Sequence, residues 1–206
     1  MKALKRVLEN NRIILTRGIG LLILVLYFES RSYWDANGGE LFAYVLYAIG
    51  LILVGIGSLG RMWCSLYIAG YKNRKLIDVG PYSIVRNPLY VFSFIGAVGV
   101  GLATETLTFP LLVAILFLFY YPVVIKREER KLEELFGQEY EKYKERVPSV
   151  IPNFSSFYEP ERYEVNPRVF RKHMFSALWF IWIVGILELL EALKDLGYYT
   201  PIWTIY

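Results

Sequence analysis

Five long apolar segments constrain this chain more than any other feature of its sequence. They cover Ile13–Phe28, Leu41–Gly60, Leu89–Ala103, Thr106–Ile125 and Met174–Leu193. A helix of about 20 apolar residues crosses the roughly 30 Å of hydrocarbon in a bilayer. Because only helices and closed barrels satisfy the backbone inside a membrane, we predict an all-α, multi-pass transmembrane bundle with five spans. We expect it to form one domain over residues 1–206.

The positions of the basic residues orient these spans. All but two of the 23 lysines and arginines fall on one side of the membrane if the N-terminus lies in the cytosol. Since cytosolic loops are enriched in lysine and arginine, we predict a cytosolic N-terminus and an external C-terminus. The net charge of +4 is then an orientation signal and not the footprint of a nucleic-acid partner. We expect the chain in the cytoplasmic membrane of a prokaryote.

The scarcity of metal ligands excludes several classes of site. The chain has one cysteine, Cys64, and one histidine, His173. These numbers exclude an intramolecular disulfide, a cysteine-cluster zinc site and a multi-histidine metal centre. We therefore expect neither a metal nor a nucleophile–histidine pair in the mechanism.

Residues 78–90 are the first of two predicted cytosolic stretches that break the pattern of apolar helix and short loop. Pro81 and Pro88 each remove a backbone donor and disfavour helix in the residue before them. Irregular backbone at the edge of a membrane is tolerated only against protein or a cavity. The hydrogen-bonding and aromatic side chains at this break are Tyr82, Arg86, Asn87 and Tyr90. The residues alone are also compatible with a purely structural re-entry loop.

Residues 126–148 are the second stretch, and they have the spacing of an amphipathic helix. Its apolar positions are Leu132, Leu135, Phe136, Tyr140, Tyr143 and Val147. We expect Gly137 to divide the segment into two pieces. Glu128 and Glu129 directly follow the fourth span, beside Lys126 and Arg127. Because carboxylates at that depth are costly unless paired with a cation or a ligand, they are candidate site residues, with a structural ion-pair network as the alternative.

Taken in order, these motifs resemble those of a known family of membrane enzymes. The series is Gly80-Pro-Tyr-x-x-x-Arg-Asn-Pro-x-Tyr90, Glu128-Glu129-x-x-Leu132, Phe136-Gly-x-Glu-Tyr140-x-x-Tyr143 and Arg146-Val-Pro148. It resembles the isoprenylcysteine carboxyl methyltransferase and phospholipid methyltransferase superfamily over residues 78–152. The resemblance implies transfer of a methyl group from S-adenosylmethionine, with S-adenosylhomocysteine as product. It also implies a cofactor pocket that faces the cytosol and a lipophilic acceptor that enters from the bilayer.

The resemblance assigns roles to individual residues. The implied cofactor-binding positions are Tyr82, Arg86, Asn87, Pro88, Tyr90, Glu128 and Glu129, and the implied catalytic positions are Glu129, Arg127 and Lys126. A glutamate would pair with the ammonium of the cofactor, a cation with its carboxylate, and a tyrosine face with its sulfonium. Two departures from the family pattern stand out. Asn87 stands where most members have a histidine. Arg127 directly precedes the glutamate pair, whereas carboxyl methyltransferases place an arginine two or four residues before the pair.

The sequence leaves the methyl acceptor open. A carboxylate is already ionised at neutral pH and needs only a cation to hold it, whereas a phospholipid amine must first lose a proton to a base such as Glu129. The basic residues near the site favour the carboxylate of a prenylcysteine-like or other lipid-like acid. A phosphatidylethanolamine-type N-methyltransferase is the alternative, and a non-catalytic scaffold that binds lipid or a partner is a third possibility. The linker Asn153–Lys172 is expected to be a lid or an oligomer contact.

Overall fold

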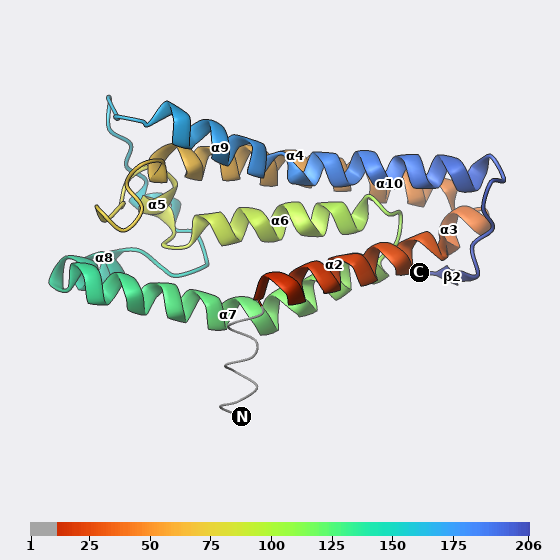
Figure 1. Ribbon diagram of the computed structural model, residues 1–206, viewed down its shortest axis with the longest axis horizontal. Coiled ribbons are helices and arrows are strands. Elements are labelled where there is room, and N and C mark those ends of the chain that lie inside the picture. Colours follow the sequence, from red (N-terminus) through yellow and green to blue (C-terminus); the bar gives the residue numbers. More distant parts are fainter. Residues whose placement is uncertain (1–11) are drawn as a thin grey trace.

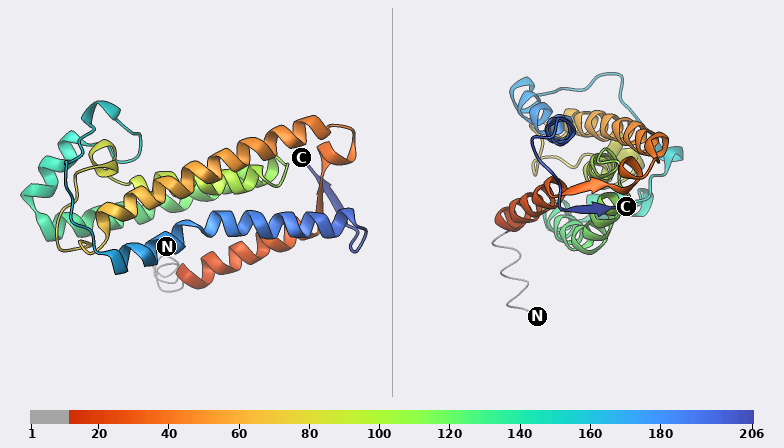
Figure 2. Two further views of the ribbon diagram at one scale, coloured as in Figure 1. Left: turned by 90° about the horizontal axis from the view of Figure 1, so that it is seen from above. Right: turned by 90° about the vertical axis from the view of Figure 1, so that its right-hand side faces the viewer.

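The computed structural model describes residues 12–206, so the predicted cytosolic N-terminal segment, residues 1–11, lies outside the described residues. In chain order the elements are α2 (Arg12–Phe28), β1 (Ser30–Ser32), α3 (Tyr33–Ala36), α4 (Glu40–Ile68), α5 (Pro81–Ile84), α6 (Pro88–Leu102), α7 (Thr108–Phe136), α8 (Gln138–Arg146), the 3₁₀ turn η1 (Phe154–Ser156), α9 (Pro167–Ala177), α10 (Trp179–Asp195) and β2 (Trp203–Ile205). The long helices run side by side along the long axis of the molecule, with α6 in the middle (Figures 1 and 2).

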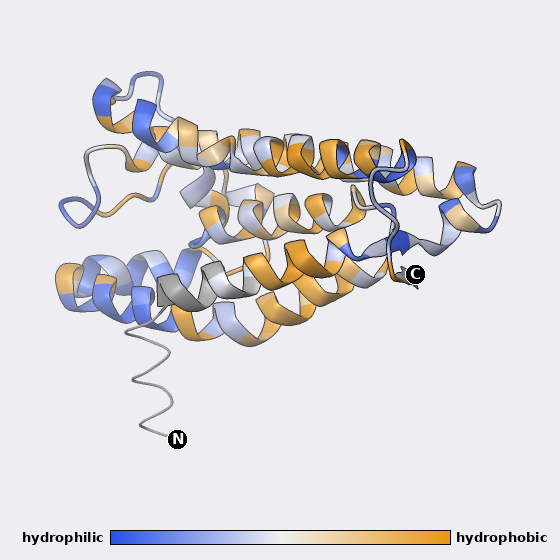
Figure 3. Ribbon diagram, turned by 45° about the vertical axis from the view of Figure 1, so that its right-hand side comes forward, coloured by the Kyte–Doolittle hydropathy of each residue, from blue (hydrophilic) through white to orange (hydrophobic). Residues whose placement is uncertain are grey.

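Within the described residues, three helical stretches are long and apolar enough to cross a membrane. They are α4, α7 and the consecutive pair α9–α10, each of 29 residues, and α6 is a shorter apolar helix. The structure therefore confirms a multi-pass helical membrane protein, while five spans and their direction stay a prediction. Hydrophobic residues occupy the middle of the helices, and hydrophilic residues gather at the end that carries α5 and α8 (Figure 3). We call this the α5–α8 end.

Tight contact between α4 and α6 sets the core of the bundle. A Cβ atom added to Gly57 would lie 2.5 Å from the Cα of Gly96, and one added to Gly50 would lie 2.6 Å from the backbone nitrogen of Ala103. Small residues permit this close approach. Because lipid provides no hydrophobic driving force between membrane helices, their association depends on such close van der Waals packing. Helix α6, which starts at the loop of the candidate site, is thereby packed along α4.

The end of the molecule opposite to α5 and α8 holds a small sheet that the prediction of an all-α fold missed. Strands β1 and β2 pair in parallel, with Ser30 opposite Trp203. Lys194 is 8% exposed and reinforces this end, since its Nζ donates to the carbonyls of Tyr27 (3.1 Å) and Ser30 (2.8 Å) and pairs with Glu191 at 2.9 Å. Three-residue strands carry too little periodicity to be seen in a sequence.

Candidate functional site

The loop before α6 is built on two proline starts. Pro81 opens the single-turn helix α5 and Pro88 opens α6, both at positions where the missing N–H costs nothing. Gly80 has φ +59°, and a Cβ there would collide with the ring of Tyr67, so glycine is required for both reasons. The predicted irregular stretch is therefore one helical turn between two bends, and it packs against protein.

Helix α7 continues beyond its apolar residues and brings the predicted glutamate pair to this loop. The Glu129 carboxylate accepts hydrogen bonds from Asn87 Nδ2 (2.8 Å), Arg86 Nε (3.0 Å) and Ser149 Oγ (2.8 Å). The Asn87 amide also donates to the backbone carbonyl of Ser149 at 3.1 Å. Two segments far apart in the sequence thus converge on one carboxylate.

Arg86 fastens the segment after α8 to the same point. Its Nη1 donates to the carbonyls of Val147 (2.7 Å) and Lys144 (3.0 Å), and its backbone N–H donates to the carbonyl of Pro148 (2.8 Å). The side chain of Arg86 is 11% exposed and that of Glu129 is 17% exposed. This largely buried ion pair and its hydrogen bonds hold the loop, α7 and the segment after α8 together.

Gly137 ends α7 as predicted, and α8 then folds back under the loop. Gly137 has φ +49°, which permits the sharp reversal. The buried Tyr140, Tyr143 and Val147 pack with Leu76, and Tyr143 Oη donates to the carbonyl of Tyr82 at 2.7 Å. The apolar face of the predicted amphipathic segment therefore packs against the rest of the protein at the α5–α8 end.

A cavity of about 420 Å³ lies between the loop and α7. This volume falls within the range of small-molecule sites. The residues that line it are Ile68, Lys72, Asn73, Lys75, Leu76, Ile77, Tyr82, Arg86, Asn87, Pro88, Leu89, Tyr90, Glu128, Lys131, Leu132 and Tyr143. Six of the seven positions that the sequence proposed for cofactor binding are among them, and the seventh, Glu129, lies behind the wall that Asn87 and Arg86 form.

The proposed catalytic cations do not reach this cavity. Lys126 and Arg127 are exposed and are absent from its lining. Side chains three and four residues apart share one face of a helix, so Glu128 faces the cavity together with Lys131 and Leu132, and its two predecessors point elsewhere. The spacing from Glu128 could have identified Lys131. The other two lysines of the lining come from the turn after α4, and no sequence signal marked them.

Two polar groups of the cavity have no protein partner in the part of the chain that the structure describes. The Tyr82 hydroxyl is buried and makes no hydrogen bond. Burial raises the pKa of this phenol well above its usual value, so the group stays a neutral donor. The carboxylate of Glu128 forms no ion pair or hydrogen bond to another described residue. Buried polar atoms are normally satisfied, and an orphaned donor beside a free carboxylate fits a polar, cationic ligand.

The first residues of the linker Asn153–Lys172, from Asn153 to Tyr158, lie against α5. Backbone N–H groups of Gly80 and Asn153 donate to the carbonyls of Tyr158 (2.8 Å) and Ile84 (2.9 Å), respectively. Ser83 accepts at its carbonyl from Ser156 Oγ (2.8 Å) and at its hydroxyl from the backbone of Tyr158 (2.9 Å). These hydrogen bonds hold the short helix α5 in place.

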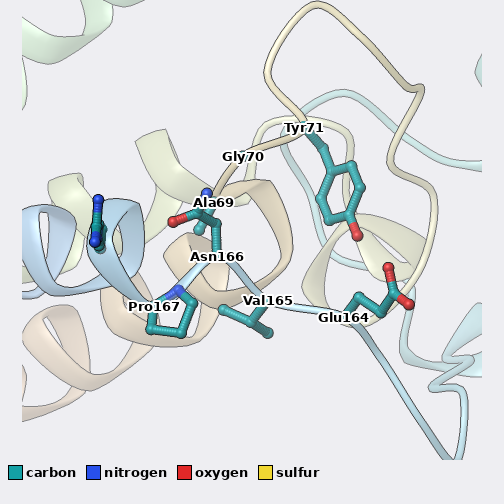
Figure 4. Close-up of a pocket in the computed structure, with 8 residues that line it drawn as sticks. Ala69, Gly70, Tyr71, Glu164, Val165, Asn166 and Pro167 are labelled. Atoms are coloured by element: carbon teal, nitrogen blue, oxygen red, sulfur yellow. The ribbon is translucent and has the colours of Figure 1, made fainter.

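A second hollow, of about 560 Å³, lies where α4 ends and α9 begins (Figure 4). Its lining is Ala69, Gly70, Tyr71, Glu164, Val165, Asn166, Pro167 and Arg168, with no residue of the predicted site. Asn166 caps α9 by accepting from the backbone of Val169 at 3.2 Å, and a Cβ on Gly70 would lie 3.0 Å from the Cβ of Asn166. These residues are accounted for by the contact between the two helix ends.

Comparison with known proteins identifies the family. The family model described as phospholipid methyltransferase matches residues 38–139. The nickel-cobalt-cadmium resistance protein NccN of Alcaligenes xylosoxydans xylosoxydans is 32% identical over 91% of this chain and 86% of its own length. The cobalt-zinc-cadmium resistance protein CzcN of Cupriavidus metallidurans is 31% identical over 99% and 93%.

A eukaryotic enzyme is similar over the motif region. The protein-S-isoprenylcysteine O-methyltransferase of Schizosaccharomyces pombe is 36% identical over 39% of this chain and 34% of its own length. No solved structure matches the chain. The two relatives that match over nearly their full length, together with the family model over the cavity-forming helices, show that the chain belongs to the phospholipid methyltransferase family of membrane proteins, which includes the isoprenylcysteine methyltransferases.

Proposed function

We propose that this protein is an integral membrane methyltransferase that uses S-adenosylmethionine to methylate the carboxylate of a lipophilic acid. The observation that carries the proposal is the cavity between the loop and α7. Its lining includes several cations, the carboxylate of Glu128 without a described partner, and Tyr82, whose buried hydroxyl makes no hydrogen bond to a described residue. We also propose five spans with the cavity facing the cytosol, which agrees with the positions of the basic residues.

The groups of the cavity fit the three polar parts of this cofactor. Glu128 would pair with its ammonium, and the lysines Lys72, Lys75 and Lys131 would hold its carboxylate. Tyr82 would donate a hydrogen bond, and the ring of Tyr90 supplies an electron-rich face for a sulfonium. The bound cofactor supplies an electrophilic methyl group, so the protein has to position the acceptor and exclude water.

The distribution of carboxylates favours an acid as acceptor. Glu129 accepts four hydrogen bonds, two of them from the guanidinium of Arg86, and these bonds hold the loop against α7. If Glu128 pairs with the ammonium, no carboxylate or histidine of the cavity lining remains to deprotonate an amine. A carboxylate acceptor needs no such base. The reacting oxygen attacks the methyl carbon as the carbon–sulfur bond breaks, giving a methyl ester and S-adenosylhomocysteine.

N-methylation of a phospholipid is the second candidate. The unpaired carboxylate of Glu128 favours it, because that group could accept the proton if the ammonium of the cofactor were held elsewhere. Incubation with radiolabelled S-adenosylmethionine and native lipids separates the two reactions. Base-labile methyl ester supports the acid, and base-stable headgroup label supports the amine.

Cofactor binding decides between an enzyme and a scaffold. S-Adenosylhomocysteine is expected to raise the melting temperature of the purified protein, and Glu128→Gln is expected to abolish most of that shift. Glu134→Gln, an exposed position on the same helix, is the matched control and should bind as the wild type does. No stabilisation of the wild type at millimolar ligand would refute the proposal.

A further inference from the structure

Arg61 is a charged residue inside the apolar helix α4, about two turns before the helix ends. Its guanidinium touches three other helices. One Nη donates to Ser93 Oγ of α6, the other lies 3.4 Å from Ser176 Oγ of α9, and the group stacks 5.6 Å above the ring of Phe180 in α10. The Nε–H is buried and has no hydrogen-bond partner in the described part of the chain.

This arginine has no counter-ion among the described residues. The ion pairs of the structure lie elsewhere, and hydroxyls and a ring face satisfy donors without neutralising the charge. A charged side chain at membrane depth is costly and usually has a charged partner or a functional role. The planar fork of a guanidinium matches carboxylate and phosphate oxygens, which it binds with two parallel hydrogen bonds.

Arg61 is linked to the candidate cavity through Ser93. Ser93, which accepts from Arg61, also donates to the carbonyl of Leu89 at 2.6 Å, and Leu89 lines the cavity. The arginine thus lies close to the cavity, on its membrane side.

The surface beside Arg61 is apolar and exposed. Phe175 and Trp179 flank the two residues that touch its guanidinium on α9 and α10, and each is 61% exposed. Large apolar side chains facing outward at this level would contact the chain of a lipid. An exposed apolar surface next to a cation without a counter-ion fits a lipid that carries an anionic group.

We propose that Arg61 binds the anionic group of the lipophilic acceptor, through its free Nε–H and the Nη that has only a long contact with Ser176. This inference deepens the proposed function and rests on it, since it names the acceptor as an anionic lipid. Arg61 would then be the cation that holds the acceptor, a role for which the sequence suggested Lys126 and Arg127. A carboxylate would be the reacting group itself, whereas a phosphate would hold a lipid whose reacting group lies beside it.

Binding of matched lipid pairs to the full-length protein in neutral detergent tests the proposal. The probes are N-acetyl-S-farnesylcysteine with its methyl ester, and phosphatidic acid with diacylglycerol. The wild type should bind at least one anionic probe roughly ten- to a hundredfold more tightly than its neutral partner, as expected for hydrogen bonds between charged groups. Preference within the first pair identifies a carboxylate acceptor, and preference within the second pair alone identifies a phosphate; either result supports an anionic lipid.

Variants connect that preference to Arg61. Arg61→Gln should remove the preference for the anionic probe, while Arg74→Gln, an exposed arginine in the turn after α4, should keep it. Ser176→Ala frees one Nη without changing the charge, so affinity for the anion should stay equal or rise, whereas a purely structural arginine would show only a loss of stability. Equal preference in the wild type and Arg61→Gln would overturn the inference.

Stabilisation by S-adenosylhomocysteine, measured on the same samples, separates the two ways of failing. If the wild type and Arg61→Gln both bind the cofactor product and show the same preference for the anionic probe, the inference about Arg61 fails and the proposed function stands. If the wild type does not bind the cofactor product, the proposed function fails. If Arg61→Gln does not fold, Arg61→Lys and Ser176→Ala carry the test, since Arg61→Lys keeps the charge but loses the fork and should lose most of the preference.

Discussion

Glu128 and Glu129 are neighbours in the sequence, yet their amide substitutions should have opposite effects. Glu129→Gln removes the charge that accepts hydrogen bonds from Arg86, Asn87 and Ser149. Removing one member of a buried ion pair costs about 3–5 kcal/mol. Arg86 would keep its bonds to two backbone carbonyls, and both side chains retain some solvent exposure. We therefore expect about half of that penalty, about 2 kcal/mol.

Glu128→Gln should leave the free energy of unfolding nearly unchanged, because no described residue pairs with the Glu128 carboxylate. Its effect should fall on the ligand, with a roughly tenfold or larger loss of affinity for S-adenosylhomocysteine. Unfolding by SDS titration in a neutral detergent measures the first quantity, and calorimetric titration measures the second. The reasoning is refuted if Glu128→Gln is the destabilised variant, or if Glu129→Gln loses the ligand with its stability intact.

Four further substitutions test other parts of the structure. Tyr82→Phe removes a hydroxyl with no described partner, so the free energy of unfolding should hold or rise by up to about 1 kcal/mol while affinity for S-adenosylhomocysteine falls several-fold in the same assays. Gly57→Ala should destabilise by about 1–3 kcal/mol in the SDS titration because its Cβ would meet α6, whereas Gly55→Ala meets nothing within 4 Å and should be neutral. Ser83→Ala should cost about 1 kcal/mol and lower methyl transfer, since the linker loses a bond to α5. Lys194→Met leaves Glu191 without its cation, at the end of the molecule far from the cavity. The melting temperature should therefore fall while the KM for the cofactor stays unchanged. A raised KM would contradict the assignment of a structural role to the end that holds β1 and β2.

The parts of the fold that follow from local chemistry could be predicted from the sequence. Apolar length identified the long helices, and glycine identified the break at residue 137, because each signal lies within a few neighbouring residues. The ends of the helices were harder to predict from the sequence. Helix α7 extends through Phe136, well beyond its apolar run, and hydropathy does not mark the charged residues of its second part as helical.

The candidate site could likewise be predicted only in part from the sequence. The motif order indicated that the proline loop and the glutamate pair belong together, and the hydrogen bond between Asn87 and Glu129 joins them. Which glutamate faces the cavity depends on the rotation of α7 about its axis, and that rotation is set by packing between helices distant in sequence. Lys72 and Lys75 reach the cavity through the path of an irregular turn, and the surroundings of Arg61 come from three other helices, so neither could be predicted from neighbouring residues.

Photolabelling with radioactive S-adenosylmethionine tests the central claim most directly, because ultraviolet light crosslinks a bound cofactor to the residues around it. The account predicts label in peptides from residues 68–90 or 128–143, displaced by excess S-adenosylhomocysteine and strongly reduced by Glu128→Gln. Displaceable label confined to the hollow between α4 and α9, or no displaceable label in a folded protein, would contradict it.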